Sequence, residues 1–135
     1  MKLSFTKMHG CGNDYIYFNA FTQSIDNPEA LSIRLSQRRK SIGGDGIILV
    51  CPSDRADAKM RIFNQDGSEA KMCGNGVRCV AKFVVDQGLV PGDRETVAID
   101  TLSGVKQIRL LRENGQVVGA TVDMAQAILT PKEIP

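Results

Sequence analysis

The stretch VRCVAKFVVDQ, residues 77–87, decides which fold this sequence favours. Apolar side chains leave only a narrow polar stripe through Arg78, Lys82 and Asp86, and such a pattern is typical of a helix that is buried nearly all round. Gly88 supplies a residue suited to ending the helix. We therefore expect one central, buried helix.

Strand patterns flank this helix on both sides. Strands are predicted at residues 15–18, 47–50, 60–64, 69–72, 95–101, 105–112 and 117–124. In the last stretch every second residue from Val118 to Met124 is apolar, which predicts that these side chains share one buried face. Asn114-Gly115 predicts a tight turn before it. Several strands around one helix favour an α+β fold.

The first forty residues carry a candidate loop and a candidate helix. A polar, glycine-rich stretch at residues 9–14 follows a strand pattern around Leu3 to Phe5, and we expect it to form a loop and a first candidate site. Asn27 before Pro28 predicts a helix start. The basic run at residues 38–40 is interpreted as the solvated end of that helix, where positive charge is favourable.

Composition limits the class of protein. The 135 residues are 42% hydrophobic and 24% charged, which favours one compact domain over a disordered chain. A net charge of +2 gives little support for nucleic acid as a partner. The sequence contains neither the ~20 apolar residues of a membrane span nor a secretory signal. We expect a cytoplasmic protein with no membrane partner.

Four cysteines, Cys11, Cys51, Cys73 and Cys79, are expected to be thiols in a reducing cytosol. They form no CxxC pair, and on one helix Cys73 and Cys79 would point about 240° apart. His9 is the only histidine. We therefore expect no metal site.

The segment CGNGVRC, residues 73–79, places a thiol directly before the predicted helix. Unpaired N–H groups and the helix dipole at such a start stabilise anions, so Cys73 would ionise readily and a carboxylate could bind beside it. The alternative is a small buried cysteine next to glycines that only shape a turn. The residues by themselves leave both interpretations open.

Four segments together carry a family resemblance. They are KMHGCGNDY (7–15), GGDGI (43–47), RIFNQDGSEAKMCGNGVRC (61–79) and TVDM (121–124). In this order they resemble the amino-terminal half of diaminopimelate epimerase. The resemblance implies a cofactor-independent isomerase of lysine biosynthesis, with two domains of mixed or antiparallel strands wrapped around a central helix. It also implies two catalytic cysteines, one from each domain.

The resemblance assigns roles to particular residues. Cys73 matches the first catalytic cysteine, and Asn13 and Asn64 match residues that bind the amino-acid groups of the substrate. Gly74 and Asn75 match hydrogen-bond donors at the helix start. Without the resemblance Asn13 would be a turn residue and Asn64 a hairpin residue. The sequence departs from some family members at Gly46, where they carry a glutamine that helps to contact the substrate.

We expect residues 1–118 to form the amino-terminal epimerase domain, and residues 119–135 to be a connection and the first strand of a second domain that is absent. Such a chain would serve one face of the substrate and be inactive alone. Its expected partners are an amino-acid substrate and the missing carboxyl-terminal half, while a homodimer stays open. The alternatives are a related racemase with another substrate and a non-catalytic carboxylate-binding module; a thiol redox protein is disfavoured because no CxxC pair exists.

The position of Cys73 makes it the most reactive thiol that we expect in the folded chain. Alkylation rates measured against pH, followed by peptide mapping, should show Cys73 modified first at neutral pH. Faster modification of Cys11 or Cys51 would contradict the assignment of the thiolate to Cys73.

Overall fold

A computed structural model describes residues 3–10, 13–38, 41–71 and 74–123. Its elements, in chain order, are β1 (Thr6–Gly10), β2 (Asn13–Asn19), α1 (Pro28–Leu35), β3 (Gly46–Cys51), β4 (Ala58–Asn64), β5 (Glu69–Ala70), α2 (Gly74–Asp86), β6 (Thr96–Thr101), β7 (Gly104–Glu113) and β8 (Gln116–Asp123). The eight strands of this described part form one sheet in the order β1-β2-β3-β4-β6-β7-β8, with β5 beside β4. Because β2 pairs with β3 and β4 with β6 in parallel and the other pairs are antiparallel, the sheet is mixed. The α+β prediction is confirmed.

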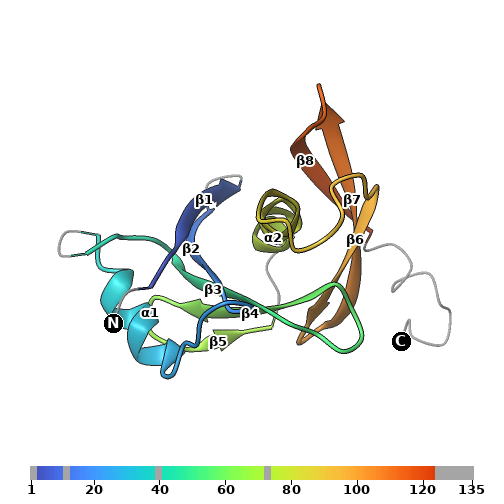
Figure 1. Cartoon of the computed structure of the whole chain (residues 1–135). Coiled ribbons are helices and arrows are strands. Elements are labelled where there is room, and N and C mark those ends of the chain that lie inside the picture. The colour runs from blue at the N-terminus through green and yellow to red at the C-terminus, as the bar shows by residue number, and fades with distance from the viewer. Residues whose placement is uncertain (1–2, 11–12, 39–40, 72–73, 124–135) are drawn as a thin grey trace, which may run out of the picture.

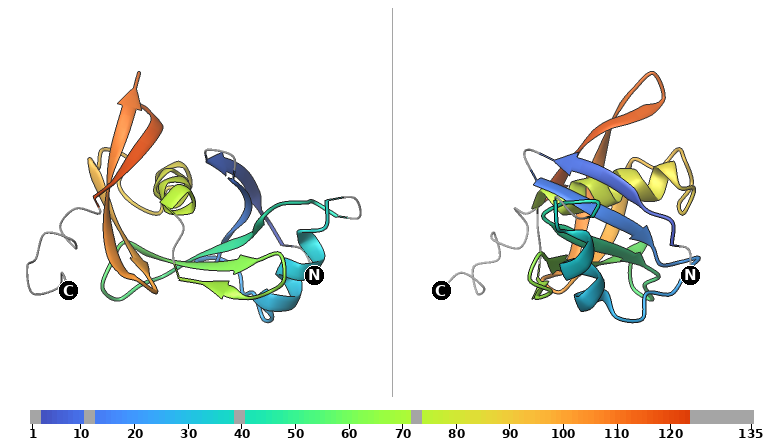
Figure 2. Two further views of the ribbon diagram at one scale, coloured as in Figure 1. Left: turned by 180° about the vertical axis from the view of Figure 1, so that it is seen from behind. Right: turned by 90° about the vertical axis from the view of Figure 1, so that its left-hand side faces the viewer.

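The sheet bends into a half-barrel whose concave side holds α2 (Figures 1 and 2). The β1–β2 hairpin stands on one side of this helix, and β6, β7 and β8 stand on the other. Accordingly α2 contacts β1 and β8, the two outermost strands of the sheet, as well as strands between them. Neither helix in the described part is long and apolar enough to cross a membrane.

The helix α2 supplies one side of the larger hydrophobic core. Its fully or almost fully buried side chains are Val77, Val80, Ala81, Phe83 and Val84. The Phe83 ring stacks on Tyr17 of β2 with 5.9 Å between the ring centroids. Cys79 and Val85 are only partly buried, and Arg78 is exposed. The helix is therefore buried on one face, and the prediction of burial nearly all round was too strong.

Strands β2, β3 and β4 are covered on both faces, which explains why the sequences of β2 and β3 are apolar without alternation. One face packs with α2 and includes Tyr15, Tyr17, Ile48, Val50, Met60 and Ile62. The opposite face includes Ile16, Phe18, Ile47, Leu49 and Phe63. On that side Leu31 and Leu35 of α1 complete a second, smaller core. The middle strands thus take part in both cores.

Local sequence signals set several element ends as predicted. The Asn27 side chain accepts a hydrogen bond from the Ala30 N–H at 3.2 Å and caps α1. Gly88 follows α2 with φ at +71°, the left-handed conformation that ends many helices. Asn114 and Gly115 both have positive φ between β7 and β8, as a tight hairpin turn requires.

Three expectations about strands need correction. The predicted loop at residues 9–14 is mostly strand, because β1 runs through Gly10 and β2 begins at Asn13, with Gly10 and Asn13 paired across the hairpin. The first strand also begins later than expected, at Thr6. An antiparallel ladder continues wherever two backbones face each other, and polar side chains do not end it.

The third correction concerns Val118, which is 58% exposed although its alternation predicted burial. The pairing passes from Arg112 with Val117 to Leu111 with Gly119, so Val118 is an extra residue in a β-bulge. The bulge reverses the alternation, which leaves Val117 buried at 4% exposure. The sheet also continues through Asp123, so β8 includes residues 118 and 119, between which a domain boundary is predicted; that boundary stays a prediction.

The packing of α2 yields a direct test. Val80 is fully buried, so Val80→Asp would place an unpaired carboxylate in the core and should lower the free energy of unfolding by more than about 3 kcal/mol. Lys82→Gln, on the exposed side of the same helix, should change it by no more than about 0.5 kcal/mol. Urea unfolding of both variants makes the comparison, and similar midpoints would contradict this packing of α2.

Candidate active site

The topology brings two predicted substrate-binding residues to the same end of adjoining strands. Asn13 begins β2, and Gly46 begins β3, which runs parallel to β2. Asn64 ends the antiparallel strand β4, where it pairs with Gly46. Both asparagines therefore lie at the edge where β2 and β3 begin and β4 ends. Asn13 is described by its backbone only.

Asn64 is held by hydrogen bonds from two directions. The buried Ser32 hydroxyl of α1 contacts the carbonyl oxygens of Phe63 and Asn64 at 3.0 and 2.6 Å, which fixes the end of β4 against that helix. The Asn64 amide nitrogen donates to the Ser68 hydroxyl at 3.2 Å across the β4–β5 turn. This contact uses one of the two N–H groups of the side-chain amide. Asn64 therefore does stabilise the hairpin, and its side-chain amide keeps a second N–H group and its oxygen for further hydrogen bonds.

The turn that positions Ser68 is itself fixed by a carboxylate. Asp66 accepts from the Ser68 N–H at 3.0 Å and from the Ser68 hydroxyl at 2.6 Å. These two hydrogen bonds favour the ionised carboxylate and lower the pKa of Asp66. Gly67 provides the positive φ of +87° that the turn needs. Asp66-Gly67 forms the predicted hairpin turn. The Asp66 side chain also positions Ser68, which binds the Asn64 amide.

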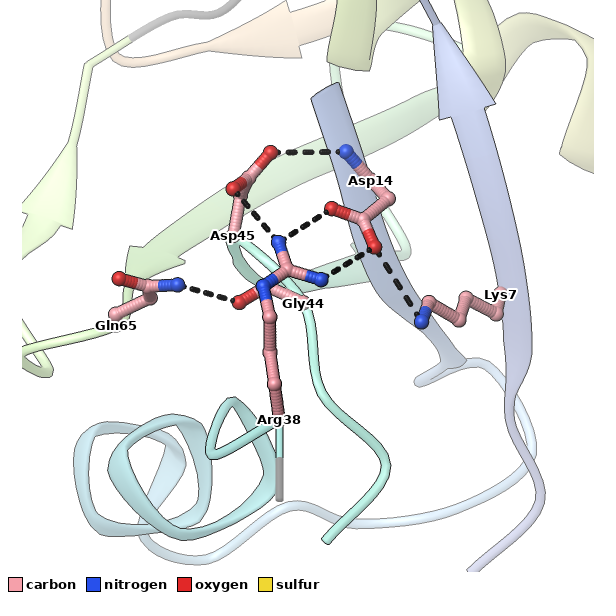
Figure 3. A network of polar contacts seen from close by, with 6 residues as sticks. All are labelled: Lys7, Asp14, Arg38, Gly44, Asp45 and Gln65. Carbon is pink, nitrogen blue, oxygen red and sulfur yellow. Dashed lines mark hydrogen bonds and ion pairs between the residues drawn. The ribbon is translucent and has the colours of Figure 1, made fainter. Parts of the chain in front are cut away.

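A charged network surrounds Asp14, the residue that follows Asn13 in the sequence (Figure 3). The Asp14 carboxylate, whose side chain is 10% exposed, accepts hydrogen bonds from both terminal guanidinium nitrogens of Arg38 at 2.9 and 3.1 Å. The Lys7 ammonium lies 3.3 Å from the same carboxylate. Arg38 also donates to Asp45 at 3.2 Å. The Arg38 hydrogen bonds, aided by Lys7, hold the pKa of Asp14 far below its usual range.

The network corrects the interpretation of the basic run at residues 38–40. The helix α1 ends at Leu35, and Arg38 lies beyond it in a specific two-pronged ion pair rather than at a solvated helix end. Arg39 and Lys40 lie outside the described residues. The contacts of Lys7, Asp14, Arg38, Asp45 and Gln65 were not predicted from the sequence, which placed Arg38 at a solvated helix end and Asp14 in a loop at residues 9–14. Three of them are charged residues of the family motifs: Lys7 and Asp14 lie in the motif at residues 7–15, which contains Asn13, and Asp45 lies in the motif at residues 43–47, which contains Gly46. Charge within these motifs was the sequence feature that could have indicated them.

The start of α2 is tied to β2. The Tyr17 hydroxyl, deep in the core, donates to the Gly76 carbonyl oxygen at 3.4 Å. Gly74 is the first residue of α2, so the sequence prediction that a helix follows Cys73 is confirmed. Cys73 itself lies outside the described residues, as do the side chains at 74 and 75. The helix start offers N–H groups to an anion, and the roles of Cys73, Gly74 and Asn75 stay predictions.

Gly46 is required by the backbone. Its φ is +157°, and a Cβ atom there would lie 2.1 Å from the Phe63 carbonyl oxygen, far inside any permitted contact. Position 46 therefore has no space for a glutamine, the residue that the resemblance implies for some family members, while β3 and β4 keep this pairing. The departure noted in the sequence is built into the strand geometry.

The two cysteines in the described part of the chain, Cys51 and Cys79, are thiols and form no disulfide. Cys51 ends β3 against the smaller core, where burial raises the pKa of its thiol. Within the residues described, no three His, Cys, Asp or Glu side chains are grouped as metal ligands would be. The described groups where β2 and β3 begin and β4 ends offer hydrogen bonds and charge.

Comparison with known proteins identifies the family. A family model for diaminopimelate epimerase matches residues 5–130. The chain belongs to the diaminopimelate epimerase family. Diaminopimelate epimerases from Methanococcus maripaludis strain S2 and Agathobacter rectalis are 53% and 51% identical to it over 98% of the chain. Their matched parts are 47% and 46% of their own lengths, so the chain spans about half of these family members.

Solved structures show how widely the fold of this family is shared. A probable proline racemase from Agrobacterium radiobacter K84 superposes with a TM-score of 0.72 over 91% of this chain and 42% of its own, at 16% identity. A methylitaconate-delta-isomerase superposes with a TM-score of 0.66 over 87% of this chain and 62% of its own, at 17% identity. At such low identity these similarities concern the half-barrel fold alone.

The Asp14 ion pair predicts a pH dependence of stability. Because folding lowers the pKa of Asp14, its contribution is complete above the unfolded value of about 3.9 and is lost as the pH falls below it. Arg38 is half exposed, which moderates the effect, so Asp14→Asn should cost about 1–2 kcal/mol at pH 7. The difference from wild type should shrink between pH 5 and pH 3, measured by urea unfolding.

Asp86→Asn is the matched control, because the Lys82–Asp86 pair is well exposed on both sides and should contribute no more than about 0.5 kcal/mol. An Asp14→Asn deficit that stays constant from pH 7 to pH 3 would contradict the assigned ion pair.

Proposed function

We propose that this chain is the amino-terminal half of a diaminopimelate epimerase, which interconverts LL- and meso-diaminopimelate without a cofactor. The observation that carries the proposal is the sequence identity to diaminopimelate epimerases, 53% and 51% over 98% of the chain. The matched region includes the segment from Cys73 to Cys79. We place the reaction in the cytoplasm, where lysine biosynthesis uses its product.

The chemistry requires two groups on opposite faces of one carbon. A base removes the α-proton from one face, and an acid returns a proton to the other face of the planar carbanion, so atoms and charge balance over the cycle. In our proposal the Cys73 thiolate is one of these groups. The other is a cysteine of a carboxyl-terminal half, and that half is the required partner. A single thiol serves one face only, so residues 1–135 alone should not invert the substrate.

The site at the sheet edge supports recognition of an amino acid. Asn13 and Asn64 would bind the α-amino and carboxylate groups of the reacting carbon. The N–H groups of Gly74 and Asn75 at the start of α2 would bind the carboxylate and stabilise the negative charge that develops when the proton leaves. For domain organisation we propose that the first domain includes β8 through Asp123 and that the connection to the second domain follows it.

The proposal is tested by reassembly. The chain is combined with the carboxyl-terminal half of the Methanococcus maripaludis relative, and LL-diaminopimelate is incubated in D₂O with the mixture and with the chain alone. We expect inversion and one deuterium at the α-carbon for the mixture and no inversion for the chain alone. Chiral chromatography with mass spectrometry measures both results.

Two cysteine variants make the test specific. Cys73→Ser should lower turnover by at least about 10³-fold, because a serine hydroxyl is rarely ionised at neutral pH. Cys51→Ser, at a thiol packed against the smaller core, should leave turnover close to wild type. Inversion by the chain alone, or full activity in Cys73→Ser, would overturn the mechanism. Turnover of a different amino acid would favour a related racemase, and binding without turnover would favour a carboxylate-binding module.

A further inference from the structure

A short segment, Gly44–Asp45, lies between the two strands that carry Asn13 and Asn64 (Figure 3). It contacts the residue that directly follows each asparagine in the sequence. These residues are Asp14 on β2 and Gln65 in the turn that follows β4. The segment therefore links the two asparagines through one residue on each side.

On the β2 side the link is reciprocal. The Asp45 N–H donates to the Asp14 carbonyl oxygen at 2.6 Å. In return the Asp14 N–H donates to the Asp45 carboxylate at 2.9 Å. Both backbone polar groups of Asp14 are thus fixed to one residue of the segment. Because Asn13 shares a peptide bond with Asp14, its backbone position follows from these contacts.

On the β4 side the link is a single side chain. The Gln65 amide nitrogen donates to the Gly44 carbonyl oxygen at 2.8 Å. The next pair along, Gly46 with Asn64, belongs to the ladder between β3 and β4. Gln65 is exposed, so this hydrogen bond adds little to the core. Its effect is to hold the turn after Asn64 to the segment.

Arg38 joins the segment to the β2 side a second time. Its guanidinium bridges the carboxylates of Asp14 and Asp45, at 2.9 and 3.2 Å from the same nitrogen. The backbone before the segment is anchored as well, because the Gly43 N–H donates to the Leu35 carbonyl oxygen of α1 at 2.8 Å. The segment is therefore fixed on three sides.

We propose that Gly44–Asp45 is a clamp that sets the separation of Asn13 and Asn64, and that Arg38, Asp45 and Gln65 are positioning residues of the site. This inference rests on the proposed function, because it takes the two asparagines as binding residues. None of the three residues needs to touch the substrate. Such a clamp affects affinity because the groups that bind a substrate must be held within about 0.5 Å of their correct positions.

The chain supplies matched controls for a merely structural role. Arg55 pairs with Asp100 at exposures of 58% and 11%, nearly the same as the 52% and 10% of Arg38 with Asp14, and that pair joins β6 to the loop after β3. Gln87 is an exposed glutamine at the end of α2. Arg55→Lys and Gln87→Met therefore repeat the chemical change away from the clamp.

The experiment compares Gln65→Met with Gln87→Met, and Arg38→Lys with Arg55→Lys. In the reassembled enzyme, Gln65→Met should raise KM for diaminopimelate about fivefold, the effect of one net hydrogen bond, with kcat within about twofold. Arg38→Lys, which loses the two-pronged geometry, should raise KM about tenfold. The two control variants should leave KM unchanged, and Gln65→Lys, which restores an N–H donor, should recover most of the loss.

Amide hydrogen exchange in the chain alone separates the clamp from the proposed function. Gln65→Met should accelerate exchange at Asp14 and Asp45, and Gln87→Met should not. If the reassembled wild type does not turn over diaminopimelate, the proposed function fails, while exchange still decides whether the clamp exists. Equal exchange in the two variants, or faster exchange with unchanged KM in an active enzyme, would overturn the positioning role.

Discussion

The packing of α2 into the concave side of the sheet is the interaction on which the rest of the structure depends. A sheet that bends this strongly has an apolar inner face, and only a helix with a matching apolar face removes that face from water. The same contact places the start of α2 beside β2, where Tyr17 holds the Gly76 carbonyl oxygen. The core therefore sets the direction in which the helix start points, and with it the place where an anion can bind.

The polar edge is possible because the strands beneath it are rigid. Strands β2, β3 and β4 are packed on both faces, so their ends are fixed points from which side chains can be positioned. At one of these ends Asp14 is almost fully buried, and a carboxylate in such a place is tolerated only with charged partners. Lys7 and Arg38 provide them from two other parts of the chain. The ion pairs thereby connect this strand end to β1 and to the segment that follows α1.

The described residues contain two hydrophobic cores, one on each face of the middle strands. Our proposed mechanism places a further requirement on the reaction that these cores do not meet. Inversion needs acid and base groups on both faces of a planar carbon, and one edge of one sheet can present groups to one face only.

The features that the sequence did not predict correctly all depend on contacts between distant segments of the chain. The exposure of Val118 depends on a bulge in the pairing with β7, which alternation within one strand does not reveal. The strand character of residues 9–10 and 13–14 depends on a facing backbone. The role of Arg38 depends on Asp14, 24 residues earlier, and a basic residue near a helix end gave no sign of that partner.

The sequence by itself determined the α+β class, the cap at Asn27, the turn at Asn114-Gly115, the helix after Cys73 and the family, because these depend on local patterns of a few residues. Only the tertiary structure decided how much of α2 is buried, why position 46 must be glycine, and that Gly44–Asp45 joins the strands of Asn13 and Asn64. Each of these is a relation between segments that meet through sheet pairing and burial. Such relations arise from the free energy of the whole chain and leave no periodic signal in any one segment.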